Sequence, residues 1–471
     1  MRRRPSLILA LSLALAGCVV GPTYRAPPPP DGATAALVSV NPAVETTAAP
    51  PDDWWRLYRD PLLDRLIAEA FAANTDLKAA QANLAAARAV FEQARAGKYP
   101  STGLEASAVY GRDPATDEIL AIVGAKPHSI WLFDDTVDVS YEVDLFGRVR
   151  RQVEAAKADA AAAQAARDGV KITVAAETAR AYAQVCALGE QLAVARRSLA
   201  VVSHQADIAQ GRLQAGAGAR FDVVRARGLV AQAGSAIPPL EGQRRAALFQ
   251  LTALLGRTPA HAPHEAEACV NPPQLADMLP VGDGAALIRR RPDVRLADRR
   301  LAGATARIGV ATADLYPRVT LGGFYGGFAT DVSQLGQNVG LGWGVGPKFS
   351  WTFPNQTAPR ARIRQARAGA EGALDSFDSA VLQALKETEQ ALSAYGAELD
   401  HRRALAEAQA RAHEAFDLAQ GQLAAGSIAT LDLLTAEQTL IAADAAVAAS
   451  DTALVQDQIG LFKALGGGWK S

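Results

Sequence analysis

Two stretches of the chain alternate between apolar and polar residues, and both predict β-strands. From Val137 to Leu145 every second residue is apolar, and the residues between them are acidic or carry a hydroxyl group. From Trp343 to Phe353 large apolar residues alternate with glycine, lysine and small hydroxyl residues. A period of two places the two sets on opposite faces of a strand. The pattern predicts strands with one apolar and one polar face, and the polar face of the first is acidic.

Each of these strands has a candidate partner upstream. Thr102–Tyr110 fits the first, and Arg318–Phe328 fits the second, although glycines blur its alternation. The chain would then supply four strands. Their lengths approach the ~9 to 11 residues of a transmembrane strand, and aromatic residues stand near both ends of the last one. A half-buried hairpin in water would show the same alternation, so both interpretations stay open.

Long segments rich in alanine, glutamine, arginine and glutamate predict unusually long helices. Residues 148–210 contain neither proline nor a cluster of turn residues, so a continuous helix there would run roughly 90 Å at ~1.5 Å per residue. The helix predicted over Phe221–Leu255 contains Pro238 and Pro239. This pair must break or kink it, which predicts two shorter helices stacked end to end.

A second pair of long helices is predicted between Pro359 and Leu465. Glycine turns at residues 216–218 and 426–427 would reverse the chain within each pair. Helices of this length bury too little surface alone, so they have to pack in bundles, coiled coils or a closed wall.

The same order of elements occurs twice. Residues 76–100 match residues 293–317 at an offset of 217, and residues 177–256 match residues 387–466 at an offset of 210. The first copy is therefore seven residues longer (217 − 210). The extra residues are predicted in the loop of the first hairpin, because insertions cost little there.

The N-terminus has the form of a secretory signal. Three arginines at positions 2–4 precede an apolar run from Leu7 to Leu15, which leads to Ala16, Gly17 and Cys18. The small residues before Cys18 resemble a bacterial lipobox, in which the cysteine is acylated and begins the mature chain. We expect a diacylglycerol and an N-acyl lipid on Cys18 and no other cofactor. An ordinary signal peptide cut nearby is the alternative.

Composition excludes several classes of protein. Past Cys18 no stretch of roughly 18 apolar residues could form a transmembrane helix. Lys+Arg 48 against Asp+Glu 49 leaves a net charge of -1, which offers no basic surface for nucleic acid. Cys186 and Cys269 are too few for a disulfide-built scaffold, and the sequence leaves open whether they pair.

Five motifs carry a resemblance to a known family. They are the lipidated start at residues 18–24, Trp54-Trp55 with Leu62, Leu63 and Leu66, the strand-to-helix junction at residues 141–148, the arginine-rich segment 290–295, and residues 309–317. In order and spacing they resemble the TolC-like outer-membrane efflux proteins, in particular the lipoprotein branch often called NodT-type. The resemblance covers nearly the whole mature chain.

This resemblance implies an α+β membrane protein, internally duplicated, that works as a homotrimer. Four strands per chain would form a twelve-stranded transmembrane β-barrel, and long helices would form a periplasmic α-helical barrel. Residues 257–284 and the chain ends would form an equatorial region. The function implied is the passive exit duct of a tripartite efflux or export system, in the outer membrane and extending into the periplasm. A periplasmic adaptor protein would couple it to an inner-membrane pump, commonly of the resistance-nodulation-division class.

Two other functions are weighed against this one. A lipid-anchored periplasmic coiled-coil scaffold would explain the helices but not the strands. An enzyme is disfavoured because no nucleophile, base and acid form a recognisable arrangement. The sequence accordingly predicts no catalytic residue.

The hairpin turns are the candidate functional sites. Gly216, Gly218, Gly426 and Ser427 would lie at the periplasmic tips that contact the adaptor, and Asp222 and Asp432 follow the two turns at equal spacing. Three copies of an inward carboxylate would form an acidic ring that favours cations. The resemblance places a gate aspartate at Asp432. Thr435 stands where the family often has a second aspartate, and Glu437 is a weak substitute. Stabilisation of the positive helix end is the competing role for both aspartates.

The chain divides into a signal peptide (1–17), a lipidated N-terminal tether (18–52), a first structural repeat (53–256), an equatorial linker (257–284), a second repeat (285–466) and a C-terminal tail (467–471). One group of metal-ligand residue types lies in the linker: His261, His264, Glu265, Glu267 and Cys269. It lacks a repeated ligand spacing, so a solvated linker is expected and no metal site is predicted.

Overall fold

A computed structural model describes residues 19–467 apart from residues 49, 113, 125, 127, 276–277, 336 and 338–339. The chain forms two compact units. Unit 1 comprises residues 1–27, 84–163 and 297–377, and unit 2 comprises residues 28–83, 164–296 and 378–471. Because the division falls within helices, both units draw on both copies of the repeat.

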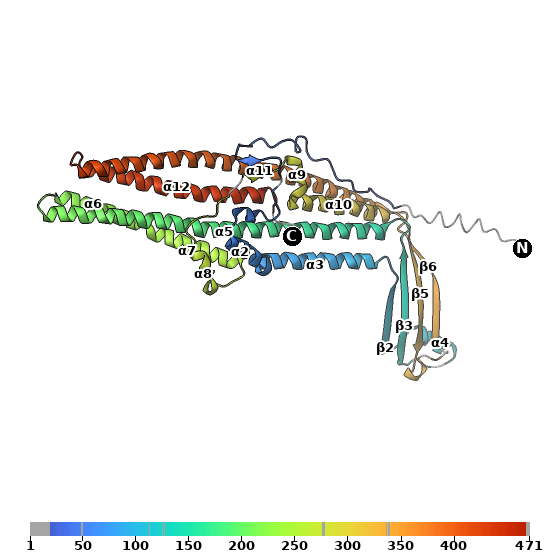
Figure 1. The fold of residues 1–471 in the computed structure, drawn as a ribbon. Helices are drawn as coiled ribbons and strands as arrows, with labels where there is room; N and C mark the ends of the chain where they lie inside the picture. The colour runs from blue at the N-terminus through green and yellow to red at the C-terminus, as the bar shows by residue number, and fades with distance from the viewer. Residues whose placement is uncertain are drawn as a thin grey trace. The chain divides into compact units, whose positions relative to one another are not determined.

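Unit 1 contains a four-stranded antiparallel sheet in the order β2-β3-β5-β6 (Figure 1). The strands are β2 (Ser101–Gly111), β3 (Ile130–Val143), β5 (Arg318–Ala329) and β6 (Leu341–Ser350). All four predicted strands are confirmed, and two of their bounds move by three residues or more. β3 begins at Ile130, opposite Gly111 of β2, rather than at Val137. β6 ends at Ser350 rather than Phe353, because its partner β5 begins opposite Ser350.

The loops of the two hairpins differ as the duplication predicts. Residues 112–129 join β2 to β3 and include α4 (Pro114–Ile122), whereas residues 330–340 join β5 to β6 and include η3 (Val332–Gln334). These loops hold 18 and 11 residues, so the first is longer by seven (18 − 11). The seven extra residues therefore lie in the first hairpin loop.

The long helices are also confirmed. They are α3 (Thr75–Ala96), α5 (Arg148–Gln214), α6 (Arg220–Ser235), α7 (Ile237–Leu254), α10 (Pro292–Ala313), α11 (Thr357–Ala424) and α12 (Thr430–Ala464). The expected interruption separates α6 from α7 at Ala236, just before the two prolines. α12 runs unbroken because the second copy has Ala448 and Ala449 at the corresponding positions. In the described part of the chain no helix is both long and apolar enough to cross a membrane.

The junction between β3 and α5 explains the motif at residues 141–148. Asp144 accepts hydrogen bonds from the backbone N–H groups of Val149 and Arg150, at 3.0 and 2.8 Å, which satisfies free donors at the start of the helix. Arg148 Nε donates to Glu142 Oε1 at 2.8 Å. The acidic residues of the motif thus fix the point where strand becomes helix.

The N-terminal segment of unit 1 docks on the same junction. Arg151, only 5% exposed, donates to the backbone oxygens of Val20 and Gly21 at 3.3 and 3.2 Å. Gly21 has a φ of +87°, and an added Cβ would lie 2.4 Å from the Cα of Gly309. A side chain at position 21 has neither the conformation nor the space that it needs. The glycine of the lipidated-start motif therefore serves close packing.

In unit 2 the equatorial segments gather around one apolar core. A short parallel pair joins β1 (Val44–Glu45) to β4 (Leu279–Pro280). Trp54, in η1 (Trp54–Tyr58), is fully buried and stacks on Phe462 of α12 with ring centroids 4.8 Å apart. Residues 44–58 and the end of α12 thus pack beside the linker, and α2 (Pro61–Ala73), α8 (His264–Glu267) and α9 (Gly284–Arg290) complete the region.

The structure answers the question about the two cysteines. Cys186 of α5 and Cys269 form a disulfide, with Cα atoms 4.7 Å apart. Cys269 is therefore no thiolate ligand, His264 contacts Glu267 at 3.2 Å, and Glu265 pairs with Arg65. Among the described residues no group of three or more His, Cys, Asp or Glu side chains is placed to hold a metal ion.

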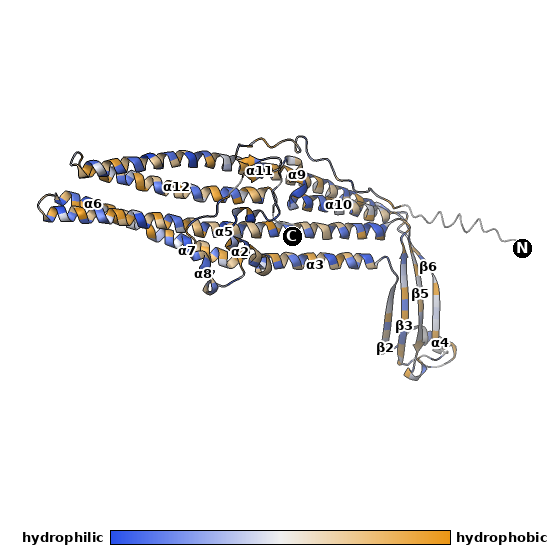
Figure 2. Ribbon diagram, viewed as in Figure 1, coloured by the Kyte–Doolittle hydropathy of each residue, from blue (hydrophilic) through white to orange (hydrophobic). Residues whose placement is uncertain are grey.

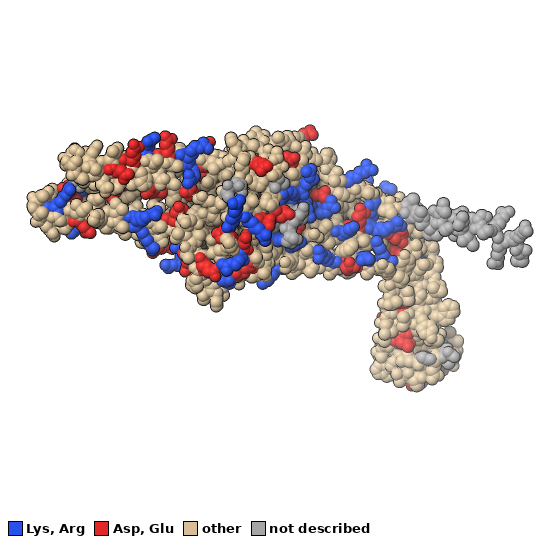
Figure 3. Space-filling model, viewed as in Figure 1, with Lys and Arg blue, Asp and Glu red and all other residues tan. Residues whose placement is uncertain are grey.

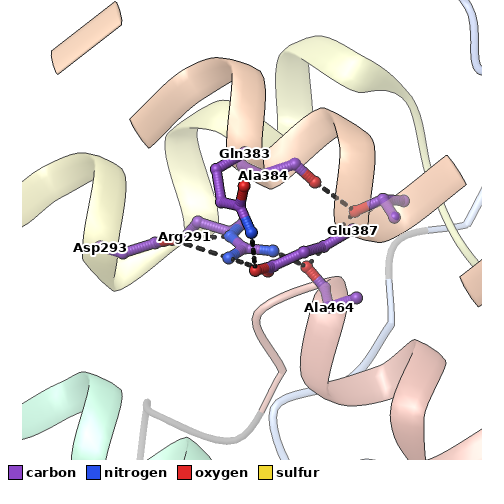
Figure 4. A network of polar contacts seen from close by, with 7 residues as sticks. Arg291, Asp293, Gln383, Ala384, Glu387 and Ala464 are labelled. Atoms are coloured by element: carbon purple, nitrogen blue, oxygen red, sulfur yellow. Dashed lines mark hydrogen bonds and ion pairs between the residues drawn. The ribbon is translucent and has the colours of Figure 1, made fainter. Parts of the chain in front are cut away.

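Arg291 ties three helices together (Figure 4). Its guanidinium donates to Asp293 and Glu387 at 2.7 Å and to the carbonyl oxygen of Ala464 at 2.8 Å. Ala464 ends α12, so Arg291 satisfies a carbonyl group that has no partner within the helix. Pro292 starts α10, where proline is well tolerated. The arginine-rich signature is thus a clamp at the base of the second repeat.

In this clamp the arginine and the carboxylates each stabilise the ionised form of the other. Burial disfavours the guanidinium, but its hydrogen bonds to Asp293 and Glu387 outweigh burial and raise the pKa of Arg291. Burial also opposes ionisation of Glu387, yet hydrogen bonds from Gln383 and Arg291 lower the pKa of Glu387 overall. Both partners are therefore charged at neutral pH, and acid has to protonate Glu387 to break the clamp.

A test of the clamp follows from the sign of this shift. Because the pKa of Glu387 is lowered in the folded state, its contribution to stability is present above the ordinary glutamate pKa of about 4.3 and is lost as the pH falls below it. We predict that the thermal midpoint of the wild type falls more steeply between about pH 5 and about pH 3 than that of Glu387→Gln. Circular dichroism of the detergent-solubilised protein measures this, with Glu414→Gln, an exposed acid of α11, as control. Parallel pH curves for wild type and Glu387→Gln would contradict the assignment.

Candidate functional site

The turn between α5 and α6 forms one hairpin tip in unit 2. Gly216 has a φ of +72°, and its N–H donates to Leu213 O at 3.1 Å. Ala217 N–H reaches back to Arg212 O at 2.9 Å. This pair of bonds is a Schellman motif, which requires a left-handed residue and favours glycine. An added Cβ at Gly218 would lie 3.0 Å from Leu213 N, so the turn leaves little room there.

The turn between α11 and α12 repeats this geometry 210 residues later. Gly426 has a φ of +73°, and its N–H donates to Leu423 O at 3.0 Å. Ser427 N–H donates to Gln422 O at 2.9 Å, and its hydroxyl reaches the same oxygen at 2.9 Å. The duplicated sequence thus builds two tips with the same hydrogen bonds.

The two candidate gate aspartates have different surroundings. Asp432 is exposed, and its Oδ2 accepts a hydrogen bond from the backbone N–H of Ala429 at 3.1 Å. This bond caps the start of α12, so the helix-terminus role weighed for Asp432 is present in the structure. Asp222 is half-buried in the first turn of α6.

Asp222 also lines a pocket of about 240 Å³ between the two hairpins. The pocket has walls from α5, α6, α11 and α12, and Arg212, Gln420, Leu433 and Leu434 contribute to it. The tips therefore carry a groove with one carboxylate and one guanidinium among apolar side chains. In the described part of one chain Asp222 lines this groove, whereas Asp432 is exposed outside it.

The suggestion that Glu437 could provide a second gate carboxylate is wrong. Glu437 is 1% exposed within a single chain, so it cannot face a shared passage. The sequence does contain a signal for this burial. Glu437 and Asp444 fall on the apolar stripe of α12 that includes Leu433, Leu440 and Val447, at helical spacing.

The two faces of the sheet differ in chemistry. One face carries apolar residues in register across all four strands: Leu104 pairs with Val137, Val137 with Tyr325, and Tyr325 with Trp343. The other face carries Asp138 opposite Gly103 and Phe324. Hydropathy varies along the strands in Figure 2, and the strands present mostly uncharged residues in Figure 3.

Large side chains on the apolar face are strongly exposed. Val345 is 81% exposed, Leu104 77% and Trp343 72%. Single exposed apolar residues are normal on proteins in water, but these three lie on one face of the same sheet. One charged residue interrupts this face within the four strands: Asp135, whose Oδ1 accepts a hydrogen bond from Gly327 N–H at 2.9 Å. A contiguous exposed apolar face of this kind marks contact with lipid or with another protein.

Cys18, the predicted lipidation site, lies outside the described residues. The described chain begins at Val19, whose side chain packs against Gly147 at the start of α5. Three features of the structure are not predicted from the sequence: the disulfide, the Arg291 clamp and the burial of Glu437.

Comparisons with known proteins agree with this geometry. The family described as "Outer membrane efflux protein" matches residues 66–257 and 285–467. The chain is 31% identical to the pyoverdine export outer membrane protein OpmQ of Pseudomonas putida, over 98% of this chain and 97% of that protein. It is 28% identical to nodulation protein T of Rhizobium leguminosarum bv. viciae, over 98% and 92% of the two chains. The solved structure of the outer-membrane channel OprN is similar, with a TM-score of 0.86 at 33% identity over 96% of this chain and 100% of that one.

Proposed function

Because the chain belongs to the outer membrane efflux protein family and is an outer-membrane channel of an efflux or export system, we propose how its parts divide that work. Three copies assemble around one axis, and their twelve strands close a barrel in the outer membrane. The observation that carries this proposal is the sheet of unit 1, in which each edge strand has one side without a partner strand in the described chain, and one face is apolar and exposed.

The two edges of the four-stranded sheet favour pairing of strands between copies of the chain. β2 and β6 stand at the ends of the strand order, so each has one neighbouring strand within the described chain. Backbone N–H and C=O groups at an open edge find no water within a bilayer. Membrane barrels contain roughly eight strands or more, which four strands cannot supply. Pairing of β6 with β2 of the next copy satisfies both edges of every chain.

The hairpin tips serve as the contact with a periplasmic adaptor, which links the channel to an inner-membrane pump. Support comes from the two equivalent tips and from the groove between them, where apolar side chains accompany Asp222 and Arg212. Exposed Phe221, at 70%, and Leu431, at 46%, add apolar surface beside the turns. Such surface suits the centre of a protein interface.

Cys18 carries the lipid anchor in this proposal. The N-terminal segment from Val19 onward packs on the start of α5, which holds the anchored end beside the strand-to-helix junction. A lipid at that position reinforces the hold of the sheet on the membrane. We assign no catalytic role to any residue, and the scaffold alternative explains the exposed apolar face less well.

The orientation of the sheet can be tested with single cysteines at Val139 and Ser140, adjacent residues on opposite faces of β3. The native Cys186 and Cys269 are joined in a disulfide and do not react. In reconstituted membranes, a cysteine at Ser140 should react with a water-soluble maleimide at least about tenfold faster than one at Val139, because thiolates form only in water. Equal labelling by the water-soluble reagent at both positions would favour the scaffold.

The gate can be tested separately with Asp432→Asn. This change keeps an oxygen that can cap Ala429 N–H while it removes the charge. If three Asp432 carboxylates form a ring, Asp432→Asn should weaken block of the channel by a multivalent cation about tenfold at low salt, which corresponds to ~1.4 kcal/mol. Single-channel recording in planar bilayers measures the block, with Glu414→Gln as the matched control. Block of unchanged strength would reject Asp432 as a gate residue.

A further inference from the structure

The two cysteines of the disulfide differ in their access to solvent. Cys186 lies on α5 in the apolar core of unit 2, and its exposed fraction is 0%. Cys269 is half-buried, and its neighbours Ala268 and Val270 are both exposed. Its Sγ lies 3.3 Å from the carbonyl oxygen of Asn271, at an exposed position. A reagent dissolved in water therefore reaches the sulfur of Cys269 but not that of Cys186.

The linker segment that carries Cys269 is held on the core by contacts other than the disulfide. Ala266, three residues before Cys269, is 0% exposed and belongs to the apolar core of unit 2. Arg257 donates two hydrogen bonds to the carboxylate of Glu69 on α2, at 2.5 and 2.7 Å. These contacts need no covalent bond, so they place Cys269 beside α5 before the disulfide forms.

Arg244 of α7 joins the two segments that carry the cysteines. Its Nε donates to the carbonyl oxygen of Val185, the residue before Cys186, at 3.2 Å. Its Nη2 donates to the carbonyl oxygens of Glu267 and Cys269, at 2.5 and 2.8 Å. A guanidinium is planar, and its N–H donors have fixed directions. Arg244 therefore sets the distance and the direction between the backbone of Cys269 and that of α5.

Gly189 leaves the room that this approach requires. It lies three residues after Cys186 on α5, and a Cβ added there would collide with the carbonyl oxygen of Cys269. The same Cβ would lie 3.0 Å from Arg244 Nη2. A side chain at position 189 would therefore push both the Cys269 segment and Arg244 away from the helix. Glycine is the residue that permits such close contact between two backbones.

We propose that an external disulfide oxidises this pair in the folded chain, that Cys269 reacts first and Cys186 second, and that Arg244 positions the second step. The Cys269 thiolate attacks the external disulfide, which gives a mixed disulfide and releases one thiolate of the oxidant. The Cys186 thiolate then attacks Cys269 Sγ and expels the other thiolate of the oxidant. The two cysteines lose two electrons and two protons, and the external disulfide takes them up to become two thiols.

This oxidation closes the base of the first hairpin. α6, α7 and the turn at residues 216–218 lie between Cys186 and Cys269, whose sequence separation is 83. The second copy has Gly396 at the position that matches Cys186 (186 + 210 = 396), so its hairpin has no equivalent cysteine on α11. A cross-link of this span chiefly restricts the unfolded chain. The reaction takes place within one chain and is independent of the proposed trimer, adaptor and gate.

The order of the two steps can be tested with Cys186→Ser and Cys269→Ser in the full chain in detergent, with glutathione disulfide as the oxidant. Circular dichroism verifies that both variants are folded. Cys186→Ser should form a glutathione adduct at Cys269 at least about 100-fold faster than Cys269→Ser forms one at Cys186, because a buried thiol reacts only when the core opens. Peptide masses locate the adduct and separate it from any reaction at Cys18. Equal rates, or faster reaction at Cys186, would overturn the proposal.

The role of Arg244 can be tested by reoxidation of the reduced chain with glutathione disulfide. Arg244→Gln should close the disulfide at least about tenfold more slowly than the wild type and accumulate the mixed disulfide at Cys269, because the two sulfur atoms meet less often. The first step, formation of that mixed disulfide, should not be slowed.

Arg245→Gln, at the exposed neighbour of Arg244, is the matched control and should close the disulfide at the wild-type rate. If Arg244→Gln fails to fold, Gly189→Ala provides a second variant, and it should also slow closure without slowing the first step. Closure of the folded variant at the wild-type rate would overturn the positioning role of Arg244. Equal slowing of both steps would overturn it as well, since that result indicates a general structural defect.

Discussion

Hydrogen bonding at the edges of the four-stranded sheet is the constraint on which the rest of the architecture depends. The sheet is antiparallel and fully paired inside, from Ser101 opposite Ser140 to Gly327 opposite Leu341, but β2 and β6 each end the strand order. Its apolar face is exposed in all four strands. A sheet of this kind is stable in a bilayer only when its edges are paired. A closed oligomer is therefore a consequence of the single chain's chemistry, whereas the number of three copies in the proposal comes from the resemblance to the family.

The remainder of the fold holds long helices in place with few side chains. Trp54 and Phe462 stack in the core of unit 2, the disulfide joins α5 to the linker, and Arg291 joins α10 and α11 to the end of α12. These contacts lie in the equatorial region rather than at the tips. At the tips less apolar surface is buried, and the core cluster of buried residues consists of Ala206, Ala209, Val223 and Ala226. Fewer large apolar contacts imply that the tips open more easily than the base.

Much of this fold could be predicted from the sequence because its elements are long and periodic. The offset of 217 that becomes 210 located the longer hairpin loop, and Pro238 located the break between α6 and α7. The start of β3 was missed because Asp134 and Asp135 interrupt the alternation after Phe133. The disulfide could not be predicted, because 83 residues separate Cys186 from Cys269 and only tertiary packing brings them together. The sequence offers Glu437 as a weak substitute for a second gate carboxylate, although its place on the apolar stripe of α12 indicates burial.

If the edges of the sheet pair between copies, this chain closes a passage only as an assembly. The most direct measurement combines the mass of the purified mature protein in detergent, corrected for bound detergent, with recordings in planar bilayers. We expect a particle of three chains of the mature protein that forms discrete, long-lived conductance steps. A monomer that inserts without any conductance would contradict it.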